Sequence, residues 1–216
     1  MRSNYSSSKA IILKRINYKD ADKIITMYTK DLGKISTIAK GIRKVTSRKR
    51  SHLELLNLVE VYLVESHDWY IITQAQAIKS FSKLKDNLLT TSWGYYIAEI
   101  FEKITSESEK NSKLFEFLEK TLEVLNTSKN FSIVNAFNLK LLRMSGFYSI
   151  QEISSNKLIN IDDDVLKYLK SIELKRYDEI AHTETSLEII QEAHLILKDY
   201  TESILERPIK TVINFN

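Results

Sequence analysis

The spacing of apolar residues changes once along this chain, close to Lys79, and that change limits the possible folds more than any other feature. Before Lys79 apolar side chains recur at every second residue, as in β-strands with one buried face. After it they recur about every 3.6 residues, as in amphipathic helices. The sequence therefore predicts an α+β protein with two domains, a sheet domain over residues 1–78 and a helical domain over residues 79–216.

Five short strands are predicted in the first domain. They span Lys9–Asn17, Lys23–Thr29, Lys34–Ala39, Leu56–Glu65 and Trp69–Ala75. Asp31-Leu32-Gly33 provides a turn between the second and third strands, and His67-Asp68 provides one between the last two. Five short strands with one long connection, about residues 42–57, are typical of a small closed barrel or a sandwich.

Helical stripes follow in the second domain. They cover residues 84–104, 114–125 and 134–144, a segment that starts at residue 162, and residues 185–204. Gly94 predicts a break or a close helix contact in the first stripe, and Gly146 predicts the end of the third. The last helix is expected to begin with a capping box at Thr185 and Glu188 and to stop before Pro208.

Three consecutive carboxylates, Asp162-Asp163-Asp164, allow two interpretations. They could bind a divalent cation, or they could cap a helix, since acids at a helix start accept hydrogen bonds from free backbone N–H groups and complement the helix dipole. We favour the cap. The chain has no cysteine, which excludes thiolate metal sites, and we expect neither a metal nor a cofactor.

A cationic stretch runs from Tyr28 to Arg50, where Asp31 is the only acid against eight basic residues. Such a block is expected to lie along a surface that attracts phosphates. Gly41 interrupts it and would let a ligand approach the main chain. We predict that nucleic acid is contacted by Lys30, Lys34, Lys40, Gly41, Arg43, Lys44, Arg48, Lys49 and Arg50. From the residues alone, a solvated basic loop that binds nothing is the alternative.

The overall charge supports a polyanion partner for the first segment only. Residues 1–80 carry 15 Lys/Arg and 7 Asp/Glu, a net charge of +8, whereas residues 81–216 carry a net charge of −4. The polar start of the chain and the absence of any run of about 18 apolar residues predict a soluble, cytoplasmic protein without a membrane partner. Aromatic residues that could stack on bases are Tyr18, Tyr28, Tyr62, Trp69 and Tyr70.

Residues for bond-making chemistry are not found in any recognisable pattern. The four histidines lie in unrelated segments, and four glycines in the whole chain do not form a phosphate-cradling loop. Spacing does not suggest a Ser, His and Asp triad, and a lysine such as Lys40 in a cationic loop serves more often as a point charge for phosphate than as a nucleophile. We therefore expect a binding protein without a catalytic site.

The segment Thr26–Arg43 reads Thr-x-x-x-x-x-Leu-Gly-Lys-Ile-Ser-x-x-Ala-Lys-Gly-x-Arg, which resembles the N-terminal signature of RecO, a family of bacterial recombination and repair mediators. Ile11–Lys14 and Asp20–Ile24 resemble that family's first strand and acidic turn, although Lys19-Asp20 stands where the family usually has Gly-Glu. Leu141–Tyr148 is similar to the family's Leu-x-x-x-x-Gly-Tyr-x-Pro, with Ser149 or Ile150 in place of the proline.

This resemblance implies an OB-fold barrel that binds single- and double-stranded DNA, anneals complementary strands and helps to load RecA onto gapped DNA. The implied partners are RecR, single-strand-binding protein and, indirectly, RecA, in a cytoplasmic, nucleoid-associated protein. Many family members carry a four-cysteine zinc module after the third helix, which a chain without cysteine cannot form. The alternative is an OB-fold RNA-binding or adaptor protein without a role in recombination.

Overall fold

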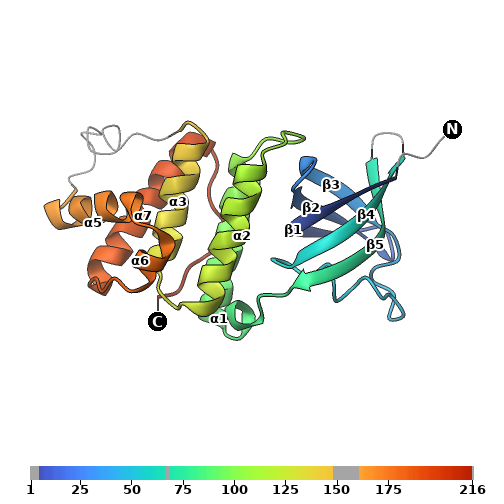
Figure 1. Cartoon of the computed structure of the whole chain (residues 1–216), viewed down its shortest axis with the longest axis horizontal. Coiled ribbons are helices and arrows are strands. Elements are labelled where there is room, and N and C mark those ends of the chain that lie inside the picture. Colours follow the sequence, from blue (N-terminus) through green and yellow to red (C-terminus); the bar gives the residue numbers. More distant parts are fainter. Residues whose placement is uncertain (1–4, 67–68, 148–160, 216) are drawn as a thin grey trace. The chain divides into compact units, whose positions relative to one another are not determined.

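The computed structural model describes residues 5–66, 69–147 and 161–215. Within these ranges the chain forms a closed five-stranded barrel followed by helices (Figure 1), so the predicted α+β class with an OB-like barrel is confirmed. The predicted turn at His67-Asp68 lies outside the described residues. The same holds for residues 148–150 of the glycine motif and for residues 151–160.

All five predicted strands are present in the barrel. They are β1 (Tyr5–Tyr18), β2 (Asp22–Thr29), β3 (Gly33–Ala39), β4 (Leu58–Ser66) and β5 (Trp69–Lys79). The order around the barrel is β1-β2-β3-β5-β4, with β4 pairing back onto β1, and every pairing is antiparallel except the parallel join of β3 to β5. The fourth strand starts two residues later than predicted, because Leu56 has a positive φ of 66° that a strand does not accommodate.

Alternate side chains of the strands fill the barrel interior. Val59, Val61 and Leu63 are fully buried, whereas Tyr62 between them is exposed, as their alternation predicts. Ile25, Met27 and other apolar side chains complete this core. Each such side chain stabilises the fold by roughly 1.5–3 kcal/mol relative to an exposed position, so the interior is the main source of barrel stability.

The outer face of β2 is also buried, because residues 105–120 belong to the same compact unit as the barrel. Tyr28 is only 1% exposed, and its hydroxyl donates to the backbone oxygen of Asn111 at 3.4 Å. The second compact unit contains residues 83–104 and the described residues from 121 onward. The division of the chain into independent domains at residue 78 stays a prediction.

The helices match the predicted stripes with two additions. They are the 3₁₀ turn η1 (Ser82–Lys85), α1 (Leu88–Ile104), α2 (Ser112–Thr127), α3 (Ser132–Met144), α5 (Asp163–Leu174), α6 (Tyr177–Ala181) and α7 (Leu187–Leu205). Helix α1 continues through Gly94, so the predicted break is absent and the glycine is buried instead. The sequence did not predict α6, because five residues are too short for a periodic stripe.

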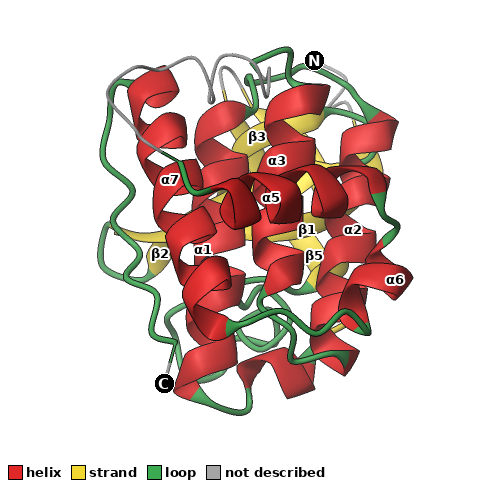
Figure 2. Cartoon of the chain, turned by 90° about the vertical axis from the view of Figure 1, so that its left-hand side faces the viewer, coloured by secondary structure: helices red, strands yellow, loops and turns green. Residues whose placement is uncertain are grey.

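Helix α3 is the centre of the second unit, where it contacts α1, α5, α6 and α7 (Figure 2). Its residues 132–139 are all buried, so the side-chain amides of Asn135 and Asn138 need hydrogen-bond partners inside the core. Asn135 donates to the backbone oxygen of Ile190 at 3.0 Å, and Asn138 accepts from Thr201 at 3.0 Å. Burial lowers the pKa of the neighbouring His194 to about 4, which gives this histidine a structural place in the core.

The helix starts test the capping predictions. The Asp162 carboxylate accepts from the Asp164 amide at 2.8 Å, which confirms the cap interpretation of the three acids. The predicted capping box at Thr185 is wrong by one residue, because Ser186 has the extended backbone of a cap and its hydroxyl accepts from Ile189. Among the described residues, no helix has the length and apolar character needed to cross a membrane.

Candidate nucleic-acid interface

The cationic stretch leaves the barrel at Gly41, where the backbone φ of +66° suits glycine. The Gly41 amide donates to the Asp22 carboxylate at 2.7 Å, and the Arg43 amide donates to the backbone oxygen of Ala21 at 2.9 Å. The acidic turn between β1 and β2 therefore holds the start of the basic connection. The acidic turn and the basic connection, which are separate in the sequence, thus form one structural feature.

Apolar anchors fix the rest of this connection. Ile42 and Leu53 belong to the barrel core. Leu56 is also fully buried, and its amide donates to the backbone oxygen of Ile12 at 2.9 Å. Between these anchors lie residues 43–52, which include most of the exposed cations of the stretch from Tyr28 to Arg50. We call residues 40–50 the basic loop. Because both of its ends are fixed, its cations are held at one place on the barrel.

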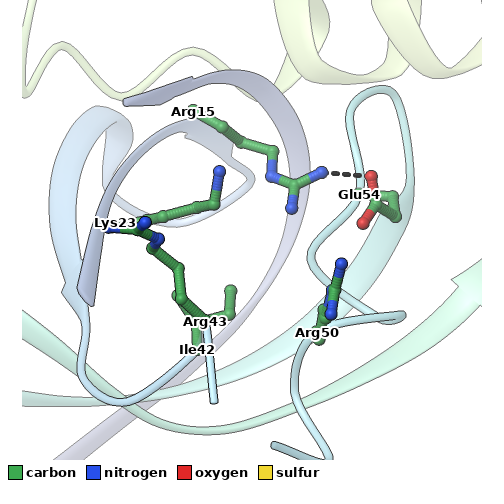
Figure 3. Close-up of a pocket in the computed structure, with 6 residues that line it drawn as sticks. All are labelled: Arg15, Lys23, Ile42, Arg43, Arg50 and Glu54. Carbon is green, nitrogen blue, oxygen red and sulfur yellow. Dashed lines mark hydrogen bonds and ion pairs between the residues drawn. The ribbon is translucent and has the colours of Figure 1, made fainter. Parts of the chain in front are cut away.

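A pocket of about 210 Å³ lies beside the basic loop (Figure 3). We call it the cationic pocket. It is lined by Arg15 of β1, Lys23 of β2, and Ile42, Arg43, Arg50 and Glu54 of the connection. Figure 3 shows the side chains of Lys23 and Arg43 on one side and those of Arg50 and Glu54 on the other, with the Arg15 guanidinium between them. Four cations and a single carboxylate therefore converge on one small volume.

The strand register explains why Arg15 is part of this pocket. Arg15 lies directly opposite Ile25, and residues that face each other across an antiparallel pair share one side of the sheet. Ile25 is part of the barrel core, so Arg15 occupies an interior-facing position. Its side chain is only 13% exposed. The pocket thus lies where charged side chains replace the apolar core of the barrel.

The cations of the cationic pocket repel one another. The pKa of Lys23 is lowered by burial first, and then by the positive charges of Arg15 and Arg43. Arg15 forms an ion pair with Glu54, yet its Nε atom is buried and makes no hydrogen bond within the described part of the chain. An anion placed here would relieve the repulsion and accept from unused donors.

The structure brings some of the predicted site residues together. Arg43 and Arg50 line the cationic pocket, and Lys40, Lys44 and Arg48 are exposed on the same basic loop. Lys49 differs from them, because its ammonium donates to the backbone oxygen of Ile72 at 3.0 Å and burial lowers its pKa.

Two predicted site residues lie elsewhere, at the turn between β2 and β3. The expectation of a wholly exposed basic stretch is wrong for Lys34, which is 8% exposed and whose ammonium donates to the backbone oxygen of Thr105. Lys30 pairs with Glu116 at 3.3 Å. Both partners belong to residues 105–120, and no local sequence pattern predicts that these residues pack against this turn.

Arg15 and Lys23 were missed, although both lie in predicted strands. For Lys23 the signal was its position in phase with the interior residues Ile25 and Met27, where a charge requires a partner or an opening to solvent. Arg15 is out of phase with the interior residues Ala10 and Ile12, and it reaches the interior side only through the register irregularity between Ile12 and Lys14. Among the aromatic residues predicted to stack on bases, Tyr28 is buried and therefore cannot contact a base, while Tyr62 and Trp69 are each 43% exposed.

The second unit has a pocket of different character, about 520 Å³ in volume. It is lined mainly by apolar side chains, among them Trp93, Phe131 and Phe215, and Lys129 is the one cation among its lining residues. Within the described ranges, no group of three or more His, Cys, Asp or Glu residues could hold a metal ion. The features suited to a polyanion therefore gather on the barrel.

Comparison with known proteins agrees with this distribution. Residues 1–81 match the family model described as "Recombination protein O N terminal", and residues 85–150 match "Recombination protein O C terminal". The chain belongs to the RecO family. The resemblance read from Thr26–Arg43 is thereby confirmed, and the two matches together run from the barrel through α3.

Several RecO proteins are similar to this chain. DNA repair protein RecO of Dehalococcoides mccartyi strain BAV1 is 36% identical over 141 residues, which cover 65% of this chain and 56% of that protein. The RecO of Roseiflexus sp. strain RS-1 is 30% identical over 68% of this chain and 52% of its own length. The chain thus aligns with little more than half of these relatives. The RecO of Caldanaerobacter subterraneus is 25% identical over 96% of both chains.

Proposed function

We propose that this RecO-family chain is a DNA repair and recombination mediator that binds single- and double-stranded DNA through the basic loop and the cationic pocket. One observation carries the proposal: Arg15, Lys23, Arg43 and Arg50 converge on a single pocket of the barrel. The relatives named DNA repair protein RecO supply the biological context.

The proposed mechanism is neutralisation of the polynucleotide backbone. Each phosphate that a lysine or arginine neutralises releases counterions, so affinity for a single strand falls by about 0.7 log units per log unit of salt for each contact. Contacts to phosphates carry no base information, so binding is independent of sequence. Two strands held on one cationic surface repel each other less, which favours the pairing of complementary bases.

The family suggests the remaining parts of the role. RecR and single-strand-binding protein are the proposed protein partners, and with RecR the protein would help to load RecA onto gapped DNA in the nucleoid of the cytoplasm. The helical residues 79–216 are the proposed contact region for proteins. The chain acts by binding and positioning, without a catalytic step of its own.

Strand annealing tests the proposal directly. The test variant changes the exposed loop cations Lys40, Arg43, Lys44, Arg48 and Arg50 to Glu. A control variant makes the same number of Lys or Arg to Glu changes at exposed positions away from the loop: Lys83, Lys113, Lys129, Lys170 and Arg207. We expect the loop variant to lose annealing and the control to keep most of it. Equal annealing by both variants would reject the assigned surface.

An OB-fold RNA-binding or adaptor protein is the alternative, because RNA presents the same backbone phosphates to the cationic pocket. Competition between single-stranded DNA and RNA of equal length and sequence distinguishes the two roles. The repair role predicts that DNA competes at least as well as RNA. A strong preference for RNA, together with no binding of RecR from the same organism, would favour the adaptor.

A further inference from the structure

We propose that the cationic pocket is a seat for one phosphate group of a polynucleotide and that the Glu54 carboxylate fills this seat until a phosphate displaces it. The inference rests on the proposed function, which it deepens by giving the pocket a defined ligand and an internal competitor. It starts from the charges of the pocket, where Arg15, Lys23, Arg43 and Arg50 face the single carboxylate of Glu54.

The pocket has the room and the donors that a phosphate requires. Its volume of about 210 Å³ would hold several water molecules, each of which takes about 30 Å³ in the liquid. Arginine presents five N–H donors in a planar fork that matches phosphate and carboxylate oxygens. Among the described residues the buried Arg15 Nε has no hydrogen-bond partner, so this side chain keeps a donor for a further acceptor.

Glu54 has the properties of a displaceable occupant. Its carboxylate pairs with the Arg15 guanidinium, as the oxygen of a bound phosphate would. The two side chains differ in exposure: that of Arg15 is 13% exposed and that of Glu54 is 47% exposed. Glu54 can therefore move into solvent at little cost, while Arg15 stays in place for the incoming anion.

This arrangement links phosphate binding to the release of Glu54. A phosphate that binds the Arg15 guanidinium competes with Glu54 for its donors, so the carboxylate weakens the affinity and shortens the lifetime of the complex. A protein that pairs two strands must also let them go. The internal carboxylate provides for that release without a second ligand.

Replacing Glu54 with Gln in the full chain tests the proposal, and Glu65→Gln is the matched control, since Glu65 is an exposed acid on β4 that does not line the pocket. Both variants remove one negative charge from the barrel unit. We expect E54Q to bind single-stranded oligothymidine about three- to tenfold more tightly than wild type at moderate salt. The slope of log affinity against log salt should stay close to that of wild type, because the same phosphate is neutralised in both complexes.

A second variant and a second probe keep the test independent of folding and of the DNA role. Glu54→Asp keeps the charge on a shorter side chain, so its affinity should lie between those of wild type and E54Q. Inorganic phosphate, compared with chloride at equal ionic strength, should raise the melting temperature of E54Q more than that of wild type, because it binds the folded state. Oligonucleotides with and without a 5′-phosphate show which phosphate enters: tighter binding of the phosphorylated strand indicates a terminal group, and equal binding indicates a phosphodiester.

The outcomes separate the two proposals. If wild type binds DNA but E54Q has the same affinity as E65Q, the phosphate seat is wrong and the DNA-binding role stands. If no variant binds DNA but inorganic phosphate still stabilises E54Q selectively, the DNA role is wrong and the seat stands. A loss of affinity in E54Q would overturn the idea of Glu54 as a competitor.

Discussion

The hairpin of β2 and β3 has cations near both of its ends, and the two ends differ in the acceptors that these cations contact. At its turn, Lys30 pairs with the carboxylate of Glu116, and Lys34 donates to the backbone oxygen of Thr105. Both acceptors belong to residues 105–120. At its open end, near Lys23 and Ala39, the cations surround the cationic pocket and share one carboxylate, Glu54. We call these the packed end and the open end.

The difference between the ends teaches that a cationic stretch is not a binding surface by composition alone. Lysines at the packed end have intramolecular acceptors, and these acceptors are more than 70 residues away in sequence. Arginines at the open end crowd together beyond what the nearby carboxylate neutralises. Under the proposed function, unmatched charge is therefore a better guide to the phosphate site than charge itself.

The largest expected effect concerns a glycine at the packed end. Gly33 has a φ of +69°, and a Cβ atom there would lie 2.2 Å from the backbone oxygen of Glu109. Gly41 at the open end has a similar φ of +66°, but its nearest neighbour would be a Lys44 side-chain atom at 3.8 Å. Gly33→Ala should cost about 3 to 4 kcal/mol of unfolding free energy, against about 1 to 2 for Gly41→Ala, as measured by urea unfolding. Equal costs would mean that residues 105–111 do not pack on this turn.

A large effect on binding is expected at the open end. Arg43→Glu combined with Arg50→Glu replaces two pocket cations with anions, so the affinity for single-stranded DNA should fall at least about tenfold. The matched reversal at the packed end changes Lys30 together with Glu116, as Lys30→Glu and Glu116→Lys, which keeps the ion pair. That variant should bind like wild type in fluorescence anisotropy. Comparable losses in both would remove the distinction between the ends.

A smaller change should appear in strong alkali. Burial, helped by the charge of Glu109, raises the pKa of Tyr28 to about 12 from an ordinary value of 10.0. The unfolded chain therefore releases this proton first, so the contribution of Tyr28 to stability is complete below pH 10 and is lost as the pH rises to about 12. Tyr28→Phe should show a weaker loss of unfolding free energy across this range. Identical pH profiles would contradict the burial of Tyr28.

The smallest expected effect is a change in how steeply the DNA affinity depends on salt concentration. Arg43→Gln removes one proposed phosphate contact, so the dependence of log affinity on log salt should become shallower by about 0.7. Lys30→Gln should leave the slope unchanged, because Lys30 is paired with Glu116. Titrations at four or more salt concentrations measure both slopes. A shallower slope for Lys30→Gln would place a phosphate at the packed end.

Much of the fold could be predicted from local patterns, because strands and helices follow the spacing of apolar residues. Val59, Val61 and Leu63 point inward as their alternation indicates, and Asp162 caps its helix as its position indicates. Arg43 and Arg50 could be nominated from charge and their place beside Gly41. Contacts between distant segments could not be predicted in this way.

Two residues show where local patterns stop. Lys34 can be buried because its ammonium donates to the backbone oxygen of Thr105, and the spacing of residues near Lys34 does not predict that partner. Arg15 enters the cationic pocket because of its register against Ile25 and its ion pair with Glu54, both of which depend on how distant strands and loops meet. Alternation along β1 would place Arg15 on the side opposite Ala10 and Ile12, and only the register irregularity between Ile12 and Lys14 brings it to the interior side.

The parallel join of β3 to β5 has a consequence for how the barrel comes apart. Among the described residues it is registered at only two pairs, Thr37 with Tyr70 and Ile38 with Ile71, whereas the neighbouring joins are longer. The barrel therefore has its weakest strand pairing between β3 and β5. Local unfolding would begin with the separation of these two strands, while the other pairings still hold the five strands in one open, curved sheet.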